Sequence, residues 1–280
     1  MKVFNTIAEI QAARWENPRL SWGLVPTMGY LHQGHLSLVE KASLDNERVI
    51  ATIFVNPTQF AEGEDLSSYP RNLERDLSLL EKAGCDFVFV PQDREMYPAG
   101  FQTAVSVNVI TKNLEGASRP THFGGVATVV SKLFNITQPT RAYFGQKDAQ
   151  QTIVLKQLVQ DLNFNLELIV CPTVREADGL AMSSRNAYLS EAERTQAPIL
   201  NQALNAAKSK ILAGESDAEQ IRQLIKQTIE TQPLAKIDYV SVANGHSLEE
   251  LTQIEKGDLL LSTAVFFGKT RLIDNLPISL

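Results

Sequence analysis

Two of the four histidines, His32 and His35, lie three residues apart in the tetrapeptide His-Gln-Gly-His. An apolar segment ends just before it at Thr27, and an amphipathic segment starts within it at Gly34. Where a strand leads into a helix, the first helical N–H groups are unpaired and the helix dipole is positive. Such a junction binds phosphate, and two imidazoles add hydrogen-bond donors to it. We therefore predict a phosphate-binding site at this junction.

A metal site is the main alternative for the histidine pair, and a purely structural role is another. Structural zinc takes four protein ligands and catalytic zinc takes three. His122 and His246 are distant in sequence, and Cys85 and Cys171 form no Cys-x-x-Cys pair. The sequence therefore favours phosphate over metal.

Two other nucleotide-binding motifs are absent. Gly29 and Gly34 have the spacing of the first P-loop glycines, but His35 and Leu36 follow where a P-loop has Lys and Ser or Thr. No Gly-x-Gly pair occurs, so the dinucleotide fingerprint is missing as well. These absences argue against a P-loop kinase and against a nicotinamide-dependent dehydrogenase.

Two further strand ends carry polar side chains. Asn56 and Gln59 lie in a loop flanked by aromatic residues, and an amide both donates and accepts hydrogen bonds. Lys147 and Asp148 lie where an apolar segment turns into a helix, so that Lys147 suits a phosphate and Asp148 suits a ribose hydroxyl. The simpler alternatives are a turn with solvated amides, and an aspartate that only caps its helix.

The segment Met182-Ser183-Ser184-Arg185 is another candidate. It is a hydroxyl-rich turn with one guanidinium group, and arginine binds phosphate oxygens in a bidentate manner. A surface loop in which Arg185 occurs by chance is the alternative.

Composition limits the class of protein. A chain of 280 residues with 44% hydrophobic residues can bury a sizeable core, and we expect two unequal domains. The net charge of -6, with both signs interspersed, argues against nucleic-acid binding. Two cysteines outside any motif fit a reducing compartment, the segment Met1–Thr6 has no continuous apolar run typical of a signal peptide, and no apolar run approaches about 20 residues. We expect a soluble cytoplasmic protein with small-molecule partners and no membrane partner.

Strand-like and helix-like segments alternate through about the first 175 residues. This pattern predicts an α/β fold, a doubly wound, Rossmann-like parallel sheet with helices on both faces. The predicted strands are 23–27, 48–55, 86–90, 141–144 and 166–170, and the predicted helices are 34–46, 72–83, 125–136 and 148–162. Ligands bind beyond the carboxyl ends of such strands. The histidine junction, the amide loop and the loop with Lys147 all begin there.

A smaller C-terminal α+β domain is predicted after this sheet. Its predicted helices are 191–213 and 217–231, and its predicted strands are 236–242, 259–267 and 270–273. Ser190, Ser216 and Ser247 each begin a Ser-x-x-Glu pattern, which is typical of a helix start. With the joint placed at Gly179, the predicted domains are 1–178 and 179–280.

Taken together, these segments resemble the pantothenate synthetase family of the nucleotidylyltransferase superfamily. The resemblance covers nearly the whole chain, with the segments in the same order. The matching segments are Pro26–Gly29 with His32–His35, Phe54–Phe60, Tyr69–Arg71, Leu114–Pro120 with His122 and Phe123, Phe144–Asp148, Asp178–Ala181 with Ser183–Asn186, and Arg271–Asn275.

The resemblance implies a ligase reaction in two steps. ATP and pantoate give pantoyl adenylate and pyrophosphate, and β-alanine then attacks the adenylate to give pantothenate and AMP. The implied cofactor is Mg²⁺ on the phosphates, with no assigned protein ligands. Asp76 is one candidate, and an exposed helical carboxylate is the alternative role for it. The resemblance also implies a homodimer, with ATP and pantoate bound by domain 1–178 and a lid formed by domain 179–280.

The resemblance further implies roles for individual residues. The catalytic residues would be His35, His32, Lys147 and Arg185, and we expect His35 to stabilise the leaving pyrophosphate by hydrogen bonding. The ATP-binding residues would be Met28, Gly29, Tyr30, Leu31, His32, Gln33, Gly34, His35, Gly145, Gln146, Lys147, Asp148, Val174, Met182, Ser183, Ser184 and Arg185. The substrate-binding residues would be Gln59 and Gln151, with Asn56 and Arg119 as further candidates. Gln146 stands where many family members have Glu, so the role of its side chain stays open.

Two other functions fit the same motifs. Another nucleotidylyltransferase would leave a stable dinucleotide as its product instead of AMP. A regulatory nucleotide-binding protein would bind ATP without releasing pyrophosphate. The presence of His32, His35, Lys147 and Arg185 argues against the regulatory protein.

Overall fold

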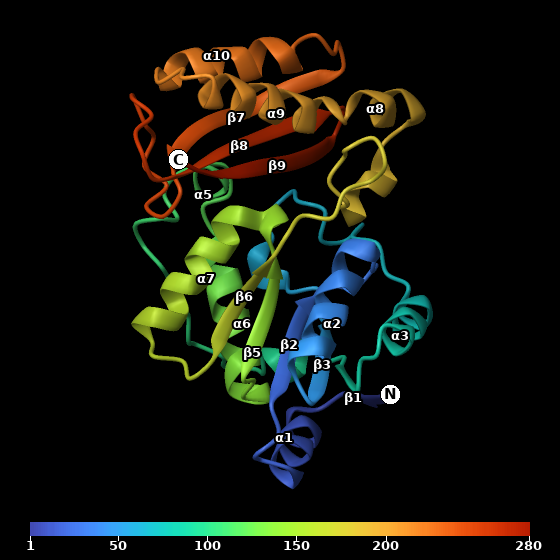
Figure 1. The fold of residues 1–280 in the computed structure, drawn as a ribbon. Helices are drawn as coiled ribbons and strands as arrows, with labels where there is room; N and C mark the ends of the chain where they lie inside the picture. Colours follow the sequence, from blue (N-terminus) through green and yellow to red (C-terminus); the bar gives the residue numbers. More distant parts are fainter. The chain divides into compact units, whose positions relative to one another are not determined.

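The computed structural model describes residues 1–280, and the chain divides into two compact units (Figure 1). The first unit comprises residues 1–145 and 151–172, and the second comprises residues 146–150 and 173–280. Each unit has a hydrophobic core of its own. The functional division into domains 1–178 and 179–280 stays a prediction.

The first unit is built on a six-stranded parallel sheet with the strand order β1-β4-β3-β2-β5-β6. Its strands are β1 (Lys2–Phe4), β2 (Trp22–Thr27), β3 (Arg48–Ile53), β4 (Phe87–Phe89), β5 (Arg141–Gly145) and β6 (Glu167–Cys171). Its helices are α1 (Ile7–Glu16), α2 (Gln33–Asp45), the 3-10 turn η1 (Pro57–Gln59), α3 (Leu73–Lys82), α4 (Asp93–Met96), α5 (Glu115–Ser118), α6 (His122–Thr137) and most of α7 (Ala149–Asp161). The predicted doubly wound α/β fold is confirmed.

The order in which strands are added to this sheet changes direction between the neighbouring strands β2 and β5. From β2 the chain continues to β3 and β4 on one side, and it then returns to β5 on the other side. β2 and β5 pair in parallel, with Gly23 opposite Arg141 and Leu24 opposite Ala142. The carboxyl ends of the strands at such a reversal are the usual ligand site of this fold. The histidine junction directly follows β2.

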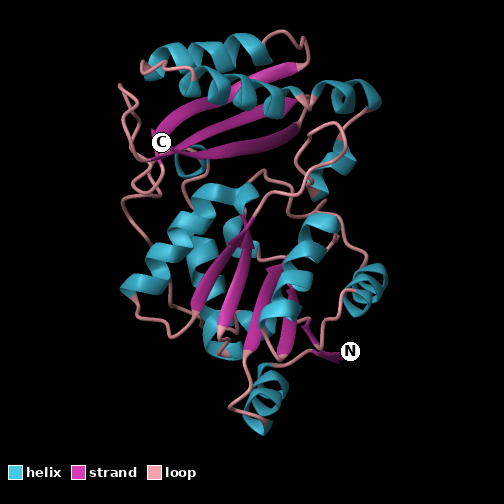
Figure 2. Cartoon of the chain, in the orientation of Figure 1, coloured by secondary structure: helices cyan, strands magenta, loops and turns pink.

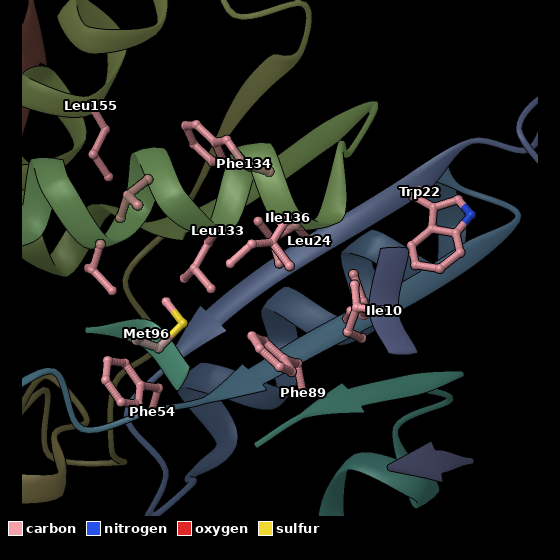
Figure 3. Packing of buried hydrophobic residues seen from close by; sticks show 14 of the residues in the cluster. Ile10, Trp22, Leu24, Phe54, Phe89, Met96, Leu133, Phe134, Ile136 and Leu155 are labelled. Atoms are coloured by element: carbon pink, nitrogen blue, oxygen red, sulfur yellow. The ribbon is translucent and has the colours of Figure 1, made fainter. Parts of the chain in front are cut away.

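The central strands are buried on both faces, which explains their nearly continuous apolar sequences. Because side chains alternate along a strand, Leu24 faces the hydrophobic cluster that also contains Ile10 of α1 and Leu133 of α6 (Figure 3). Val25 faces the opposite side and packs with Val39 of α2. None of the helices combines the length and the apolar character needed to cross a membrane.

The second unit contains a three-stranded antiparallel sheet with helices on one face, as Figure 2 shows. Its strands are β7 (Ala235–Asn244), β8 (Asp258–Phe267) and β9 (Thr270–Ser279), and its helices are α8 (Glu191–Gln196), α9 (Ile199–Leu212) and α10 (Ala218–Ile229). It also contains the 3-10 turns η2 (Gln146–Asp148) and η3 (Ser184–Tyr188). The core between the sheet and α9 and α10 includes Leu204, Ile221 and Val265. The predicted α+β class of this region is confirmed.

Several elements differ in extent from the sequence prediction. The segment 191–213 forms two helices instead of one, because Pro198 has no N–H group to continue the first helix. Strand β9 runs to Ser279 although it contains Pro277. It is an edge strand, where a missing N–H removes no necessary ladder bond. β1 and α1 were not predicted. β1 has only three residues, which is too short to show the alternation of a strand.

The three predicted capping boxes have different outcomes. Ser190 caps α8, with its Oγ accepting from Glu193 N at 3.4 Å and its N–H donating to Glu193 Oε2 at 2.8 Å. The prediction for Ser216 is wrong, because the next residue, Asp217, caps α10. The prediction for Ser247 is wrong as well, since no helix follows it and Leu248 has a φ of 59°.

Helix α6 and the η1 turn approach each other closely at Gly125. A Cβ atom on Gly125 would lie 2.4 Å from Thr58 O and 2.6 Å from Gln59 Cα. The same atom on the preceding residue, Gly124, would have no neighbour within 4 Å. Glycine at position 125 therefore allows the backbone of the predicted substrate-binding turn to lie against α6.

We expect Gly125→Ala to lower the free energy of unfolding by about 1–3 kcal/mol, the usual effect of overpacking. The added methyl group must displace the backbone at Thr58 and Gln59. Gly124→Ala is the matched control, and we expect it to be neutral or to stabilise the protein by up to about 1 kcal/mol, because alanine favours helix. Urea unfolding followed by circular dichroism measures both variants. Equal destabilisation by the two substitutions would contradict the close approach.

Candidate active site

His32 and His35 are both fixed by backbone hydrogen bonds at the start of α2. His32 is the N-cap, and its Nδ1 accepts from Gly34 N at 3.1 Å. His35 Nδ1 accepts from His32 N at 3.3 Å, and the two ring centroids are 4.0 Å apart. A nitrogen that accepts a hydrogen bond carries no proton, so each neutral ring has its proton on Nε2. The sequence predicted donors at this place, and the structure fixes both rings as Nε2–H donors.

A buried carboxylate holds the turn between β2 and α2. Asp76 of α3 is 1% exposed, and its two oxygens accept from Tyr30 N at 2.7 Å and from Leu31 N at 2.8 Å. Gly29 and Tyr30 have φ angles of 82° and 51°, in the left-handed region that residues other than glycine seldom adopt. The two hydrogen bonds stabilise this turn and thereby place His32.

This geometry corrects the sequence interpretation of Asp76. The alternative that Asp76 is an exposed helical carboxylate is wrong, because its side chain is buried. Both oxygens already accept backbone hydrogen bonds, which leaves them poorly suited to a metal ion. Throughout the chain, no three His, Cys, Asp or Glu side chains are grouped so that they could hold a metal. Arg75, at 3.7 Å, compensates part of the buried charge.

The structure brings the predicted amide loop to the histidine turn. Asn56 is buried, and its Nδ2 donates to Gln59 Oε1 at 3.1 Å and to Gly125 O at 3.2 Å. Asn56 Oδ1 in turn accepts from Tyr97 Oη at 2.7 Å. The half-buried Gln59 points its Nε2 at Met28 Sδ, 3.1 Å away. Asn56 therefore orients Gln59 beside the turn that follows β2.

The backbone of Gln59 is also held from the region where α6 begins. His122 Nδ1 lies 3.0 Å from Gln59 O, and Arg119 Nη2 donates to the same oxygen at 3.4 Å. Arg119 also forms a bidentate pair with Glu64, with both distances at 2.7 Å. The substrate-binding role of Arg119 stays a prediction, and its positive charge is already balanced by Glu64.

The other predicted residues of the first unit occupy simpler positions. Gln33 is exposed on the first turn of α2 and donates to Glu40 Oε1 at 3.3 Å. Gly145 is the last residue of β5. Gln151 is half-buried on α7. Their roles in binding stay predictions.

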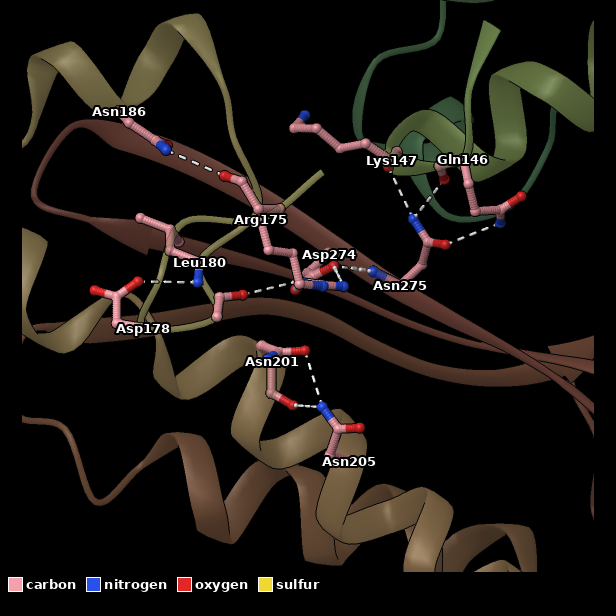
Figure 4. Close-up of polar contacts among 12 residues, drawn as sticks. Gln146, Lys147, Arg175, Asp178, Leu180, Asn186, Asn201, Asn205, Asp274 and Asn275 are labelled. Carbon is pink, nitrogen blue, oxygen red and sulfur yellow. Dashed lines mark hydrogen bonds and ion pairs between the residues drawn. The ribbon is translucent and has the colours of Figure 1, made fainter. Parts of the chain in front are cut away.

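In the second unit, one side chain of β9 holds the turn that carries Lys147. Asn275 Nδ2 donates to Gln146 O at 3.0 Å and to Lys147 O at 2.8 Å (Figure 4). Its Oδ1 accepts from Gln146 Nε2 at 3.0 Å. Lys147 Nζ lies 3.5 Å from Asp148 Oδ1. The structure thus fixes the backbone of the predicted phosphate-binding turn.

The predicted ATP-binding residues from Val174 to Arg185 share one loop of the second unit. Met182 N donates to Val174 O at 3.0 Å, and Ser183 Oγ accepts from Arg185 N at 3.2 Å. Ser184 is buried at the start of η3. The structure therefore brings these residues together, and their contact with ATP stays a prediction.

A buried ion pair anchors this loop to β9. Asp274, which is 2% exposed, accepts from Arg175 Nη1 and Nη2 at 2.7 and 2.9 Å. Arg175 Nη1 also donates to the carbonyl oxygen of Gly179, whose φ is 94°. The segment Arg271–Asn275 carried part of the family resemblance, but it received no role from the sequence. The match of this segment to the family was the only sequence signal that could have pointed to a role for Asp274 and Asn275.

Comparisons with known proteins agree with this fold. The family described as pantoate-β-alanine ligase matches residues 2–277. The chain is 58% identical over 276 residues to the pantothenate synthetase of Herpetosiphon aurantiacus, covering 99% of each chain. The crystal structure of pantothenate synthetase from Thermus thermophilus has a TM-score of 0.94 and 48% identity, with 99% of each chain covered. The pantoate-β-alanine ligase of Francisella tularensis, crystallised with β,γ ATP and β-alanine, has a TM-score of 0.80 and 37% identity, covering 99% of this chain and 97% of that one.

We expect Asp76→Asn to lower the free energy of unfolding by about 1–3 kcal/mol, the cost of a buried donor without a partner. The substitution places an NH₂ group against a backbone N–H of Tyr30 or Leu31. Arg75→Ala is the control, because it keeps both backbone hydrogen bonds of Asp76. We expect it to cost less than about 1 kcal/mol, since the Arg75 guanidinium is solvent-exposed and lies 3.7 Å from the carboxylate. Denaturant unfolding measures both variants. An equal loss for Arg75→Ala would mean that the carboxylate acts mainly through the ion pair.

The second expectation at this site concerns pH. Burial, followed by the nearby charge of Arg119, lowers the pKa of His122 from 6.5 to about 4. Below pH 6.5 the unfolded chain gains a proton at His122, whereas the folded protein stays neutral there until about pH 4. Stability is therefore present above pH 6.5 and is lost as the pH falls, by at most about 1.4 kcal/mol per pH unit.

We expect His122→Asn, which keeps a donor but does not titrate, to lose less stability than the wild type between pH 7 and pH 5. Urea unfolding of both proteins at the two pH values measures the difference. Identical losses would show that His122 is not the titrating group.

Proposed function

This chain belongs to the pantoate-β-alanine ligase family, and we propose that it joins pantoate to β-alanine through a pantoyl adenylate made from ATP. In the first step, the pantoate carboxylate attacks the α-phosphorus of ATP and pyrophosphate leaves. In the second step, the amine of β-alanine attacks the acyl carbon, the bond to AMP breaks, and the amine loses a proton. The ligase from Francisella tularensis, crystallised with β,γ ATP and β-alanine, supports ATP as a substrate.

The observation that carries this proposal is the fixed histidine pair at the start of α2. Negative charge builds on the phosphates as pyrophosphate leaves, and donors that are already oriented stabilise that charge without reorganising. The backbone bonds to His32 Nδ1 and His35 Nδ1 make both rings Nε2–H donors. We assign the stabilisation of the leaving group to these two donors, without proton transfer.

Gln59 is proposed to bind pantoate. Its carboxamide is oriented by Asn56, and its backbone oxygen is held by His122 and Arg119. An amide matches both a hydroxyl and a carboxylate oxygen of pantoate. Gln151 is proposed as a second pantoate ligand by family resemblance.

Lys147 and Arg185 are proposed to bind the phosphates of ATP. Lys147 is held through its backbone by Asn275, and Arg185 lies in the loop that also carries Val174, Met182 and Ser183. A lysine acts as a point charge and an arginine as a bidentate donor, so the two suit different oxygens of a polyphosphate.

We propose that Mg²⁺ enters with ATP as part of the substrate. The ion prefers phosphate oxygens and water. No group of three metal-binding side chains exists in the chain to hold it independently. A homodimer is proposed from the family resemblance alone, and sedimentation equilibrium would measure the state directly.

The order of the two steps provides the test of this function. We expect the enzyme with ATP, Mg²⁺ and pantoate to exchange labelled pyrophosphate into ATP when β-alanine is absent. Exchange that requires β-alanine would mean a concerted reaction of three substrates. Labelled pantoyl that stays on the denatured protein would mean an acyl-enzyme. ATP binding without exchange or AMP formation would favour a regulatory nucleotide-binding protein.

The same assay tests the histidines. We expect His35→Ala to slow the exchange about 10²–10³-fold, the effect of removing one preorganised donor. Circular dichroism establishes that the variant is folded. Exchange at a normal rate with saturating ATP and pantoate would remove His35 from the proposed mechanism.

A further inference from the structure

We propose that Asn275 is a positioning residue for Lys147, and that the side chain of Gln146 supports Asn275 with a further hydrogen bond. The inference deepens the proposed function, because it rests on the assignment of Lys147 to the phosphates of ATP. It names two side chains that act on a phosphate ligand through the backbone.

The carboxamide of Asn275 has only one favourable orientation. It is 5% exposed, and its Nδ2 donates to the carbonyl oxygens of Gln146 and Lys147 at 3.0 and 2.8 Å (Figure 4). A flipped carboxamide would put Oδ1 against these two oxygens. The two carbonyl oxygens can only accept, so they exclude the flip, and Gln146 Nε2 adds a third hydrogen bond by donating to Oδ1 at 3.0 Å.

These hydrogen bonds fix the direction in which Lys147 leaves the backbone. The carbonyl groups of Gln146 and Lys147 belong to the two peptide planes that flank the Lys147 Cα. When both planes are held by one rigid group, φ and ψ of Lys147 are fixed, and so is its Cα–Cβ bond. A lysine side chain has many rotamers and loses conformational entropy when it binds a phosphate. A fixed Cα–Cβ direction reduces that loss for Lys147.

Asn275 is itself held firmly. It lies in β9 opposite Ser262 of β8, and its own N–H donates to Asp274 Oδ1 at 2.8 Å. Asp274 is buried and forms the bidentate pair with Arg175. The group that positions Lys147 therefore belongs to a sheet with a buried ion pair beside it.

The test is a double-mutant cycle between Asn275 and Lys147, with steady-state kinetics against ATP and pantoate. We expect Asn275→Ala to raise the KM for ATP about tenfold, as the loss of two hydrogen bonds implies, and to change the KM for pantoate less than about twofold. In a Lys147→Ala background, the same substitution should change the KM for ATP less than about twofold, because residues that act as one unit are not additive. Asn205→Ala is the matched control, since Asn205 is an exposed asparagine in α9 whose side chain donates only to Asn201, and we expect wild-type kinetics.

A second variant keeps the test decisive if Asn275→Ala does not fold, which thermal unfolding would show. Gln146→Ala leaves Asn275 in place and removes the hydrogen bond to its Oδ1, and we expect the KM for ATP to rise about threefold. In a Lys147→Ala background the rise should disappear, whereas a contact of Gln146 with ATP itself would keep it.

The outcomes separate this inference from the proposed function. If Lys147→Ala weakens ATP while Asn275→Ala and Gln146→Ala do not, the inference fails alone. Fully additive effects of Asn275→Ala and Lys147→Ala would also overturn it, because Asn275 would then act elsewhere. An unchanged KM for ATP in Lys147→Ala would overturn the assignment of Lys147 in the proposed function, and the inference with it.

Discussion

The two hydrogen bonds that Asp76 accepts from Tyr30 and Leu31 decide whether the turn after β2 can present its donors. A left-handed conformation costs a residue such as tyrosine about 1 kcal/mol or more, so the turn needs compensation. A carboxylate supplies it, but a buried negative charge beside the proposed phosphate site would oppose the ligand. That charge is spread over two N–H groups, the first turn of α3 and the nearby Arg75, which limits the opposition.

Other proposed binding residues are held in the same manner, by a buried polar neighbour instead of by packing alone. Asn56 and His122 bond to Gln59 in the first unit, and Asn275 bonds to the turn of Lys147 in the second. A buried amide or imidazole that loses its partner destabilises the folded protein by about 1–3 kcal/mol in mutational series. Such a buried group therefore stabilises the one conformation of its neighbour in which the hydrogen bond forms, and it disfavours other conformations of that neighbour. Side chains that must meet a ligand gain a defined direction from neighbours that need not contact it.

The features of the fold and of the candidate site that could be predicted are those that depend on residues close together in the sequence. The apolar run of β2, the glycine and histidine spacing before α2, and the alternation of elements all lie within local windows, so the sheet and the histidine junction were accessible. Asp76 and Asn275 were not, because their partners are 45–46 and 128–129 residues away. The need for glycine at position 125 follows only from the packing of η1 against α6, which the sequence does not reveal. Even the local patterns compete: Asp217 caps α10 beside a serine with the same spacing signal.

The electrostatics explain how a chain with a net charge of -6 suits a polyphosphate. Arg119 is paired with Glu64 at 2.7 Å, and Lys147 lies 3.5 Å from Asp148, so an anionic ligand must compete with a carboxylate for each of these two cations. A neutral Nε2–H imidazole carries no net charge to be balanced in this way, and its hydrogen bond strengthens as charge builds on the oxygen that it contacts. We therefore propose that the cations mainly attract and hold the phosphates. Stabilisation that increases during the reaction is better supplied by His32 and His35, which is why we assign the leaving group to them.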